Sequence, residues 1–185
     1  EHVKPGDLFL GADSHTPTYG ALGAFAVGVG STDLAGVLRT GKTWLKVPQT
    51  VLFTLNGKLS KGVSSKDTIL FLIRKMGVEG AVYEAIEFNG TAVESMTLAS
   101  RMVLTNMVAE MGAKTGLVDT KGLQLPYPFE HQHVDEFANF RAKFTYDVSE
   151  IRPQIAKPHS PDNVVPIDEL IGTKIDAAFI GSCTN

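Results

Sequence analysis

The chain has 185 residues, of which 43% are hydrophobic and 20% are charged, and this composition is typical of a folded globular protein and argues against wholesale disorder. Seventeen Lys and Arg residues against twenty Asp and Glu residues give a net charge of -3, so we expect no nucleic-acid partner. The longest run without a charged or strongly polar side chain, residues 20–30, is far shorter than the ~20 residues that cross a bilayer, so we expect no membrane span.

The chain contains one cysteine, Cys183, which cannot form a disulfide within the chain. A lone cysteine is typical of a reducing compartment, so we expect the protein to be cytoplasmic. The sequence begins at Glu1 without Met and stops at Asn185 just after an apolar run. This predicts an internal piece of a longer protein, in which a site built from several parts of the parent chain is incomplete.

The first part of the chain combines short apolar runs with many glycines. Residues 8–10 (Leu-Phe-Leu) predict a short buried strand. The glycine-rich residues 20–30 predict a close-packed helix or a glycine-cornered segment. A short helix is expected from residue 31 to 39, ended by Gly41, and a strand is expected over residues 45–55.

The middle of the chain alternates helix and strand patterns. Residues 64–67 (Ser-Ser-Lys-Asp) are typical of an N-cap cluster that opens an amphipathic helix, which stops at Gly77. The same reading predicts a strand over 82–88, a helix over 96–111 and a short strand near 117–118. Alternation of this kind predicts a layered α/β domain.

Prolines become frequent after Lys121, where one helix is still predicted over 134–144 and a buried strand over 175–180. We therefore expect four parts: the end of a first α/β domain (1–47), a complete central α/β domain (48–150), a connector (151–166) and the start of a further α/β domain (167–185).

The first candidate site is Asp13-Ser14-His15, which follows the predicted strand 8–10. A carboxylate, a hydroxyl and an imidazole at the carboxyl end of a strand suit acid/base catalysis and substrate binding. The alternative is a polar turn in which Asp13 and Ser14 bind only neighbouring backbone, and the tripeptide alone leaves both open.

The second candidate site lies on the predicted helix 96–111. Asn106 and Glu110 are four residues apart, so they point from the same face of a mostly apolar helix. An unpaired buried carboxylate is costly, so Glu110 is expected to face a polar partner, an ion or a wet cavity. The alternative is a structural ion pair or an exposed stripe.

The third candidate is Cys183, which follows the predicted strand 175–180 among small polar residues that could donate to a thiolate. It could serve as a metal ligand, for which this chain lacks partner cysteines, or as a nucleophile with His15. Its plain alternative is a small buried hydrophobic residue.

Taken together, these segments resemble the large subunit of the aconitase superfamily. Four segments carry the resemblance: residues 11–16 (GADSHT), 20–30, 106–113 (NMVAEMGA) and 180–185 (IGSCTN). Residues 41–44 (GKTW) and 158–164 (PHSPDNV) look most like the two-subunit isopropylmalate isomerases and homoaconitases. The resemblance implies α/β/α layered domains of the aconitase large-subunit type, present here only in part.

The resemblance also implies an activity: a hydro-lyase that shifts a hydroxyl group on a hydroxy di- or tricarboxylate through an alkene, at a [4Fe-4S] cluster. By this resemblance Cys183 is one of three cluster cysteines. His15, Glu110 and Asp13 are catalytic, Asp13, Ser14, His15 and Asn106 contact substrate, and Glu110 pairs with His15. A small-subunit partner is implied as well.

Within the superfamily, the resemblance favours 3-isopropylmalate dehydratase of leucine biosynthesis as the activity, and homoaconitase is the close alternative. A cysteine hydrolase or a non-catalytic scaffold domain is a remote one. The other two cluster cysteines of the family lie beyond Asn185, so this chain by itself is expected to carry Cys183 as a free thiol, to hold no cluster and to be inactive.

Overall fold

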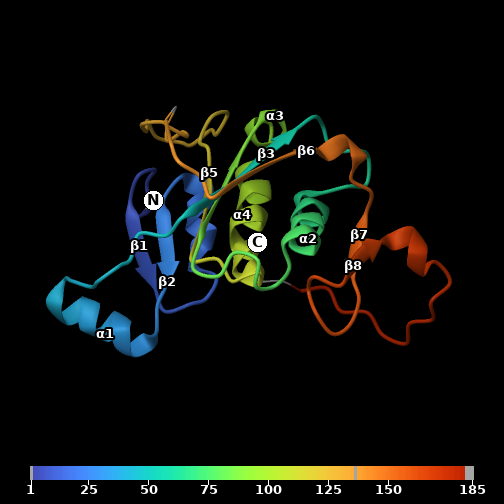
Figure 1. Cartoon of the computed structure of the whole chain (residues 1–185), viewed down its shortest axis with the longest axis horizontal. Coiled ribbons are helices and arrows are strands. Elements are labelled where there is room, and N and C mark those ends of the chain that lie inside the picture. The colour runs from blue at the N-terminus through green and yellow to red at the C-terminus, as the bar shows by residue number, and fades with distance from the viewer. Residues whose placement is uncertain (1, 136, 182–185) are drawn as a thin grey trace.

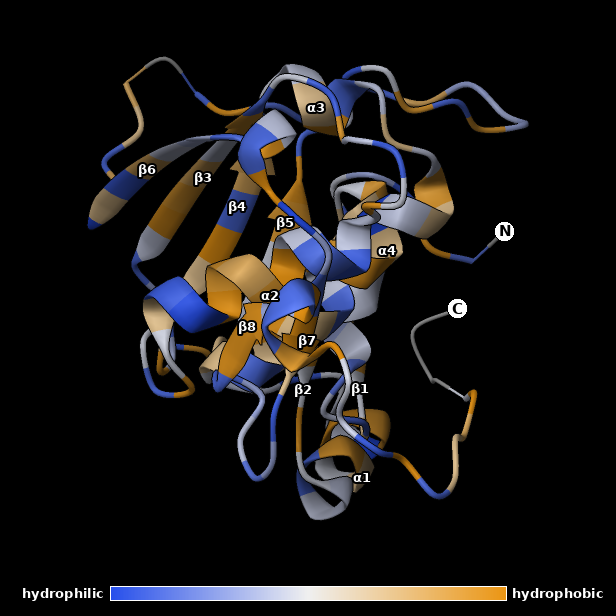
Figure 2. Cartoon of the chain, turned by 90° about the vertical axis from the view of Figure 1, so that its right-hand side faces the viewer, coloured by the Kyte–Doolittle hydropathy of each residue, from blue (hydrophilic) through white to orange (hydrophobic). Residues whose placement is uncertain are grey.

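A computed structural model describes residues 2–135 and 137–181. Figure 1 shows the whole chain, and at its centre is a parallel four-stranded sheet in the order β5-β4-β3-β6, whose strands are seen side by side in Figure 2. The strands are β3 (Thr50–Asn56), β4 (Ala85–Asn89), β5 (Thr115–Val118) and β6 (Ala142–Asp147). Alternate side chains, among them those of Phe53 and Phe88, enter one core together with α2 (Ser65–Met76) and α4 (Leu98–Asn106). The α/β class predicted from the sequence is confirmed.

The hydrophobic residues of this core are grouped in space. Figure 2 shows them along β3, β4 and β5 and on α2 beside these strands.

Among residues 2–135 and 137–181, no helix is long and apolar enough to cross a membrane.

Helix α2 begins where the N-cap cluster predicts. The Ser64 hydroxyl accepts from the Lys66 amide at 3.2 Å, and the Asp67 carboxylate accepts from the Ser64 amide at 2.7 Å. These bonds satisfy amide groups that have no partner inside a helix. The helix ends at Gly77, whose φ of +80° favours glycine.

The glycine-rich residues 20–30 do not form the close-packed helix that was one of the two predictions for them. Residues 20–30 contain no α-helix: the 3-10 helix η1 (Thr16–Leu22) is followed by β2 (Phe25–Gly28), which pairs in parallel with β1 (Leu8–Gly11). A Cβ at Gly20 would lie 1.6 Å from the carbonyl oxygen of Gly116 in β5. The glycine lets η1 lie directly on the sheet backbone, so the glycine-cornered alternative is the correct one.

The predicted helix after residue 31 and the predicted strand after residue 45 are both present, but their bounds differ from the prediction. Helix α1 (Ser31–Thr40) ends at Gly41 in the left-handed conformation, and none of its residues is buried. The strand expected over 45–55 begins only at Thr50.

The helix expected over 96–111 is present in two parts. Helix α4 runs to Asn106 and continues as the 3-10 helix η2 (Met107–Met111), which ends at Gly112 with a φ of +77°. A short helix that the sequence did not predict, α3 (Thr91–Glu94), precedes it. The strand near 117–118 is β5, and that near 82–88 is β4.

The helix predicted over 134–144 is wrong, because the described residues of this range contain no helix and β6 begins at Ala142. Ala142, Phe144 and Tyr146 are half-buried against the core, whereas Lys143 and Thr145 between them are exposed. This period of two is the pattern of an edge strand, and pairing with β3 outweighs any local helical tendency.

The expected connector is structured. β7 (Gln154–Ala156) and β8 (Val164–Pro166) form an antiparallel pair that packs against α2, between the 3-10 helices η3 (Val148–Glu150) and η4 (Ile167–Leu170). The domain boundaries themselves stay a prediction.

The buried strand expected over 175–180 is wrong, because these residues form no strand and Phe179 and Ile180 are exposed. A strand needs a hydrogen-bonded neighbour, and the described part of the chain pairs no other strand with this segment.

A half-buried carboxyl group lies on β4. Its partial burial first, and then the nearby Asp119 and Asp135 carboxylates, together raise the pKa of Glu87 from 4.5 to about 7. Glu87 lines a pocket of about 280 Å³ with Asp119, Gln132 and His133. The folded state therefore holds the Glu87 proton more tightly than the unfolded state does.

This difference predicts a pH dependence of stability. Between about pH 4.5 and 7 the folded state binds more protons, so the free energy of unfolding falls as the pH rises and levels off above 7. Glu87→Gln is expected to remove this fall, and at pH 8 to stabilise the protein by up to about 3 kcal/mol. Urea unfolding at pH 4.5 and pH 8 measures this change in the free energy of unfolding. Glu79→Gln, at an exposed glutamate, is the control. A Glu87→Gln variant that keeps the fall would contradict the assignment.

Candidate active site

The Asp13-Ser14-His15 loop follows directly after β1, as predicted. The Asp13 carboxylate accepts a hydrogen bond from the His15 amide at 2.7 Å, and the Thr16 hydroxyl donates to the Asp13 carbonyl at 2.6 Å. The loop lies on β2, where a Cβ at Gly28 would come within 2.5 Å of the Asp13 carbonyl oxygen. The backbone contacts of the polar-turn alternative are therefore present, and the Asp13 carboxylate remains 75% exposed.

The His15 ring is held from both of its nitrogens. Nε2 lies 3.4 Å from Oε1 of Glu110, and Nδ1 lies 3.2 Å from the Ser14 hydroxyl. The side chains of His15 and Glu110 are 29% and 36% exposed, so a solute can still reach the pair. The contact joins the loop after β1 to η2 across 95 positions. A carboxylate at one ring nitrogen favours a proton there and fixes the tautomer.

Asn106 lies at the end of α4 and is 2% exposed. Its side-chain amide donates to the Thr18 hydroxyl at 2.9 Å, and this hydroxyl donates to the His15 carbonyl at 2.6 Å. Thr18 was not among the site residues expected from the sequence. No local pattern marks it, because its partner Asn106 is 88 positions away.

A pocket of about 570 Å³, which we call the site pocket, brings several of these residues together. Asp13, His15 and Asn106 line it, together with Thr18 and the aromatic residues Phe9 and Tyr19. Glu110 contacts His15 without being among the lining residues. Three of the predicted residues, Asp13, His15 and Asn106, thus lie around one open cavity with a carboxylate, an imidazole and a buried amide.

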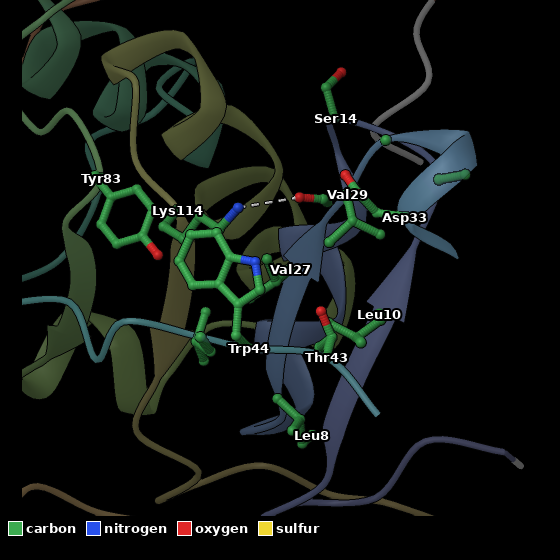
Figure 3. A pocket seen from close by; sticks show the side chains of 14 residues that line it. Leu8, Leu10, Ser14, Val27, Val29, Asp33, Thr43, Trp44, Tyr83 and Lys114 are labelled. Atoms are coloured by element: carbon green, nitrogen blue, oxygen red, sulfur yellow. Dashed lines mark hydrogen bonds between the residues drawn. The ribbon is translucent and has the colours of Figure 1, made fainter. Parts of the chain in front are cut away.

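Ser14 lies differently from its two neighbours. It lines a second pocket of about 470 Å³, which we call the tryptophan pocket, with Trp44, Tyr83 and Lys114 (Figure 3). Lys114 Nζ donates to the Gly28 carbonyl at 3.4 Å and lies 5.5 Å from the centre of the Tyr83 ring. The Asp13-Ser14-His15 loop therefore separates two pockets, a feature that the tripeptide itself does not predict.

The predicted metal ligand, Cys183, lies outside the described residues. In residues 2–135 and 137–181, no three His, Cys, Asp or Glu side chains are grouped so as to hold a metal ion. An iron-sulfur cluster is held by several cysteine thiolates, and the chain has one cysteine. The residues of this chain alone therefore do not fit a complete [4Fe-4S] cluster.

The fold and the site together define a class of protein. A family model described as the aconitase family (aconitate hydratase) matches residues 1–174, and the chain belongs to this family. Members of the family carry an iron-sulfur cluster in their intact form.

Several relatives of this chain are large subunits of named enzymes. The chain is 50% identical to a 3-isopropylmalate dehydratase large subunit of Methanopyrus kandleri, with all of this chain and 46% of that protein covered. It is 47% identical to another from Pyrococcus furiosus, covering 99% of this chain and 45% of that protein. A probable methanogen homoaconitase large subunit of Methanosarcina mazei is 48% identical over 98% of this chain and 48% of its own length. The chain spans about half the length of these relatives.

Proposed function

We propose that this chain is part of the large subunit of a hydro-lyase that moves a hydroxyl group on a hydroxy di- or tricarboxylate by dehydration and rehydration. The observation that carries this proposal is that His15 and Asn106 line the site pocket while Glu110 contacts the His15 ring. The identity of 50% to a 3-isopropylmalate dehydratase large subunit supports that enzyme of leucine biosynthesis as the particular activity.

The side chains of the site suit this chemistry. Hydroxide is a poor leaving group, so its loss requires a proton donor, and an imidazole exchanges a proton readily near neutral pH. We assign this role to His15 in its doubly protonated form: Nε2–H stays on Glu110, which orients the ring, and the proton given to the leaving hydroxyl comes from Nδ1. Asp13 and Asn106, which line the site pocket, would bind oxygen atoms of the substrate, and Ser14 would contribute through its contact with the His15 ring.

Other parts of the reaction lie outside this chain. We propose that Cys183 is one ligand of a [4Fe-4S] cluster whose other ligands belong to the rest of the protein, and we derive no step through that cluster. The relatives are large subunits, and this supports a small-subunit partner in a heterodimer or larger assembly. The lone cysteine supports a cytoplasmic location.

Homoaconitase is the second candidate, since the Methanosarcina mazei relative carries that name at nearly the same identity. Both activities share the dehydration chemistry and differ in the side chain of the hydroxy acid.

A substrate comparison tests the proposal. The complete large subunit, prepared without oxygen together with its small subunit, is expected to be brown and to convert 2-isopropylmalate and 3-isopropylmalate into each other. Turnover of homocitrate alone would transfer the assignment to homoaconitase. A colourless protein with air-stable hydrolase activity would overturn the proposal in both forms and would favour Cys183 as a nucleophile.

A further inference from the structure

Thr18 joins the Asp13-Ser14-His15 loop to helix α4. Its hydroxyl donates to the His15 carbonyl at 2.6 Å and accepts from the Asn106 side-chain amide at 2.9 Å. The Thr18 carbonyl in turn accepts from the hydroxyl of Thr105 at 3.0 Å. The position of the Thr18 hydroxyl is therefore fixed by the backbone of η1, which is itself attached to α4.

The direction of these bonds determines how Asn106 is oriented. The His15 carbonyl oxygen can only accept, so the single hydroxyl proton of Thr18 is directed toward it. The Thr18 oxygen is then an acceptor for Asn106, whose NH2 group faces Thr18 and whose carbonyl oxygen is turned away from it. Asn106 is 2% exposed, so bulk water does not compete for this contact.

We propose that Thr18 is a positioning residue of the active site. It selects one of the two orientations of the Asn106 amide and couples that amide to the backbone of the proton-transferring His15. His15, Thr18 and Asn106 line the same pocket, so an error in this contact changes the geometry offered to the substrate. The inference rests on the proposed function for its effect on turnover, and on the hydrogen bonds alone for its effect on Asn106.

The test compares three variants of the complete large subunit with its small subunit. Thr18→Val keeps the shape and removes the hydroxyl, and is expected to lower kcat about 10-fold or more with a smaller change in KM. Thr18→Ser keeps the hydroxyl and is expected to stay within about 2-fold of the original kcat. Thr115→Val is the matched control. It removes a buried hydroxyl that donates to the Ala26 carbonyl over 2.7 Å and does not line the site pocket. This variant is expected to lower stability and to leave kcat unchanged.

A second readout does not depend on activity. In the large subunit labelled with 15N-asparagine, hydrogen exchange of the Asn106 side-chain amide is followed by NMR, with the signal assigned by its loss in Asn106→Ala. Thr18→Val is expected to speed this exchange about 10-fold or more, whereas Thr115→Val is expected to leave it unchanged.

The two readouts separate the inference from the proposed function. Unchanged Asn106 exchange in Thr18→Val, or normal kcat in a dehydratase that is active, would overturn the positioning role of Thr18. Faster exchange in a protein without dehydratase activity would support the contact and overturn the proposed function instead. In an Asn106→Ala background Thr18→Val should cause no further loss of kcat, and two losses that multiply would also overturn the inference.

Discussion

In the complete protein, Glu110→Gln is expected to lower kcat about 100-fold, because the His15 ring loses the carboxylate that holds its proton on Nε2. Glutamine has nearly the same size, but its amide can donate as well as accept, so it does not fix the Nε2 proton and the ring orientation in the same way. The present contact of 3.4 Å is at the long end of the hydrogen-bond range, and such contacts commonly tighten when substrate binds.

Stability distinguishes this role from a structural one. The Glu110 side chain is 36% exposed, so the substitution is expected to change the free energy of unfolding by less than about 1 kcal/mol. Steady-state kinetics and urea unfolding of the same preparation measure the two effects, and exposed Glu79→Gln is the control for a lost carboxylate. A Glu110→Gln enzyme with normal turnover would show that Glu110 has no part in the reaction.

The second large effect concerns Arg101, which is completely buried in α4. Its guanidinium group donates to the carbonyl oxygens of Asp119 at 2.6 Å and Lys121 at 2.7 Å, and to those of Met96 at 3.2 Å and Glu94 at 3.4 Å. Burial lowers the pKa of Arg101, while the Asp119 and Glu94 carboxylates act in the opposite direction. The side chain thus ties the start of α4 to the segment that follows β5.

Arg101→Met is expected to lower the free energy of unfolding by about 3 kcal/mol or more, because several buried carbonyl groups lose their donor at once. Arg101→Lys keeps the charge but not the planar fork of donors, so an intermediate loss is expected. Arg74→Met on the exposed face of α2 is the matched control and should stay within about 0.5 kcal/mol. Equal stability of Arg101→Met and Arg74→Met in urea unfolding would rule out this role of Arg101.

The fold was predictable where local chemistry decides it. The cap at Ser64 and the glycines at 41, 77 and 112 end or begin helices for reasons that are visible in the sequence. Residues 20–30 could not be assigned from composition, since the choice between a helix and a glycine-cornered segment depended on the contact of Gly20 with Gly116. Likewise, β6 and the β7–β8 pair depend on β3 and α2, which lie far away in the sequence.

The site was predictable in its chemistry more than in its geometry. The family resemblance implied the pairing of His15 with Glu110, the need of a carboxylate on an apolar helix for a polar partner agreed with it, and the structure places the two side chains in contact. The same reasoning missed Thr18, whose single hydroxyl is unremarkable until Asn106 is folded against it. It also placed Ser14 in the same cavity as its neighbours, whereas Ser14 lines the tryptophan pocket.

A crystal structure of the complete large subunit with a bound hydroxy acid tests the central claim most directly. The predicted result is a hydroxy acid in the site pocket, with an oxygen atom within about 3.2 Å of the His15 ring and another within the same distance of Asn106, and with Glu110 still bonded to Nε2. A hydroxy acid bound away from these residues, for example in the tryptophan pocket beside Trp44 and Lys114, would contradict the assignment of the active site.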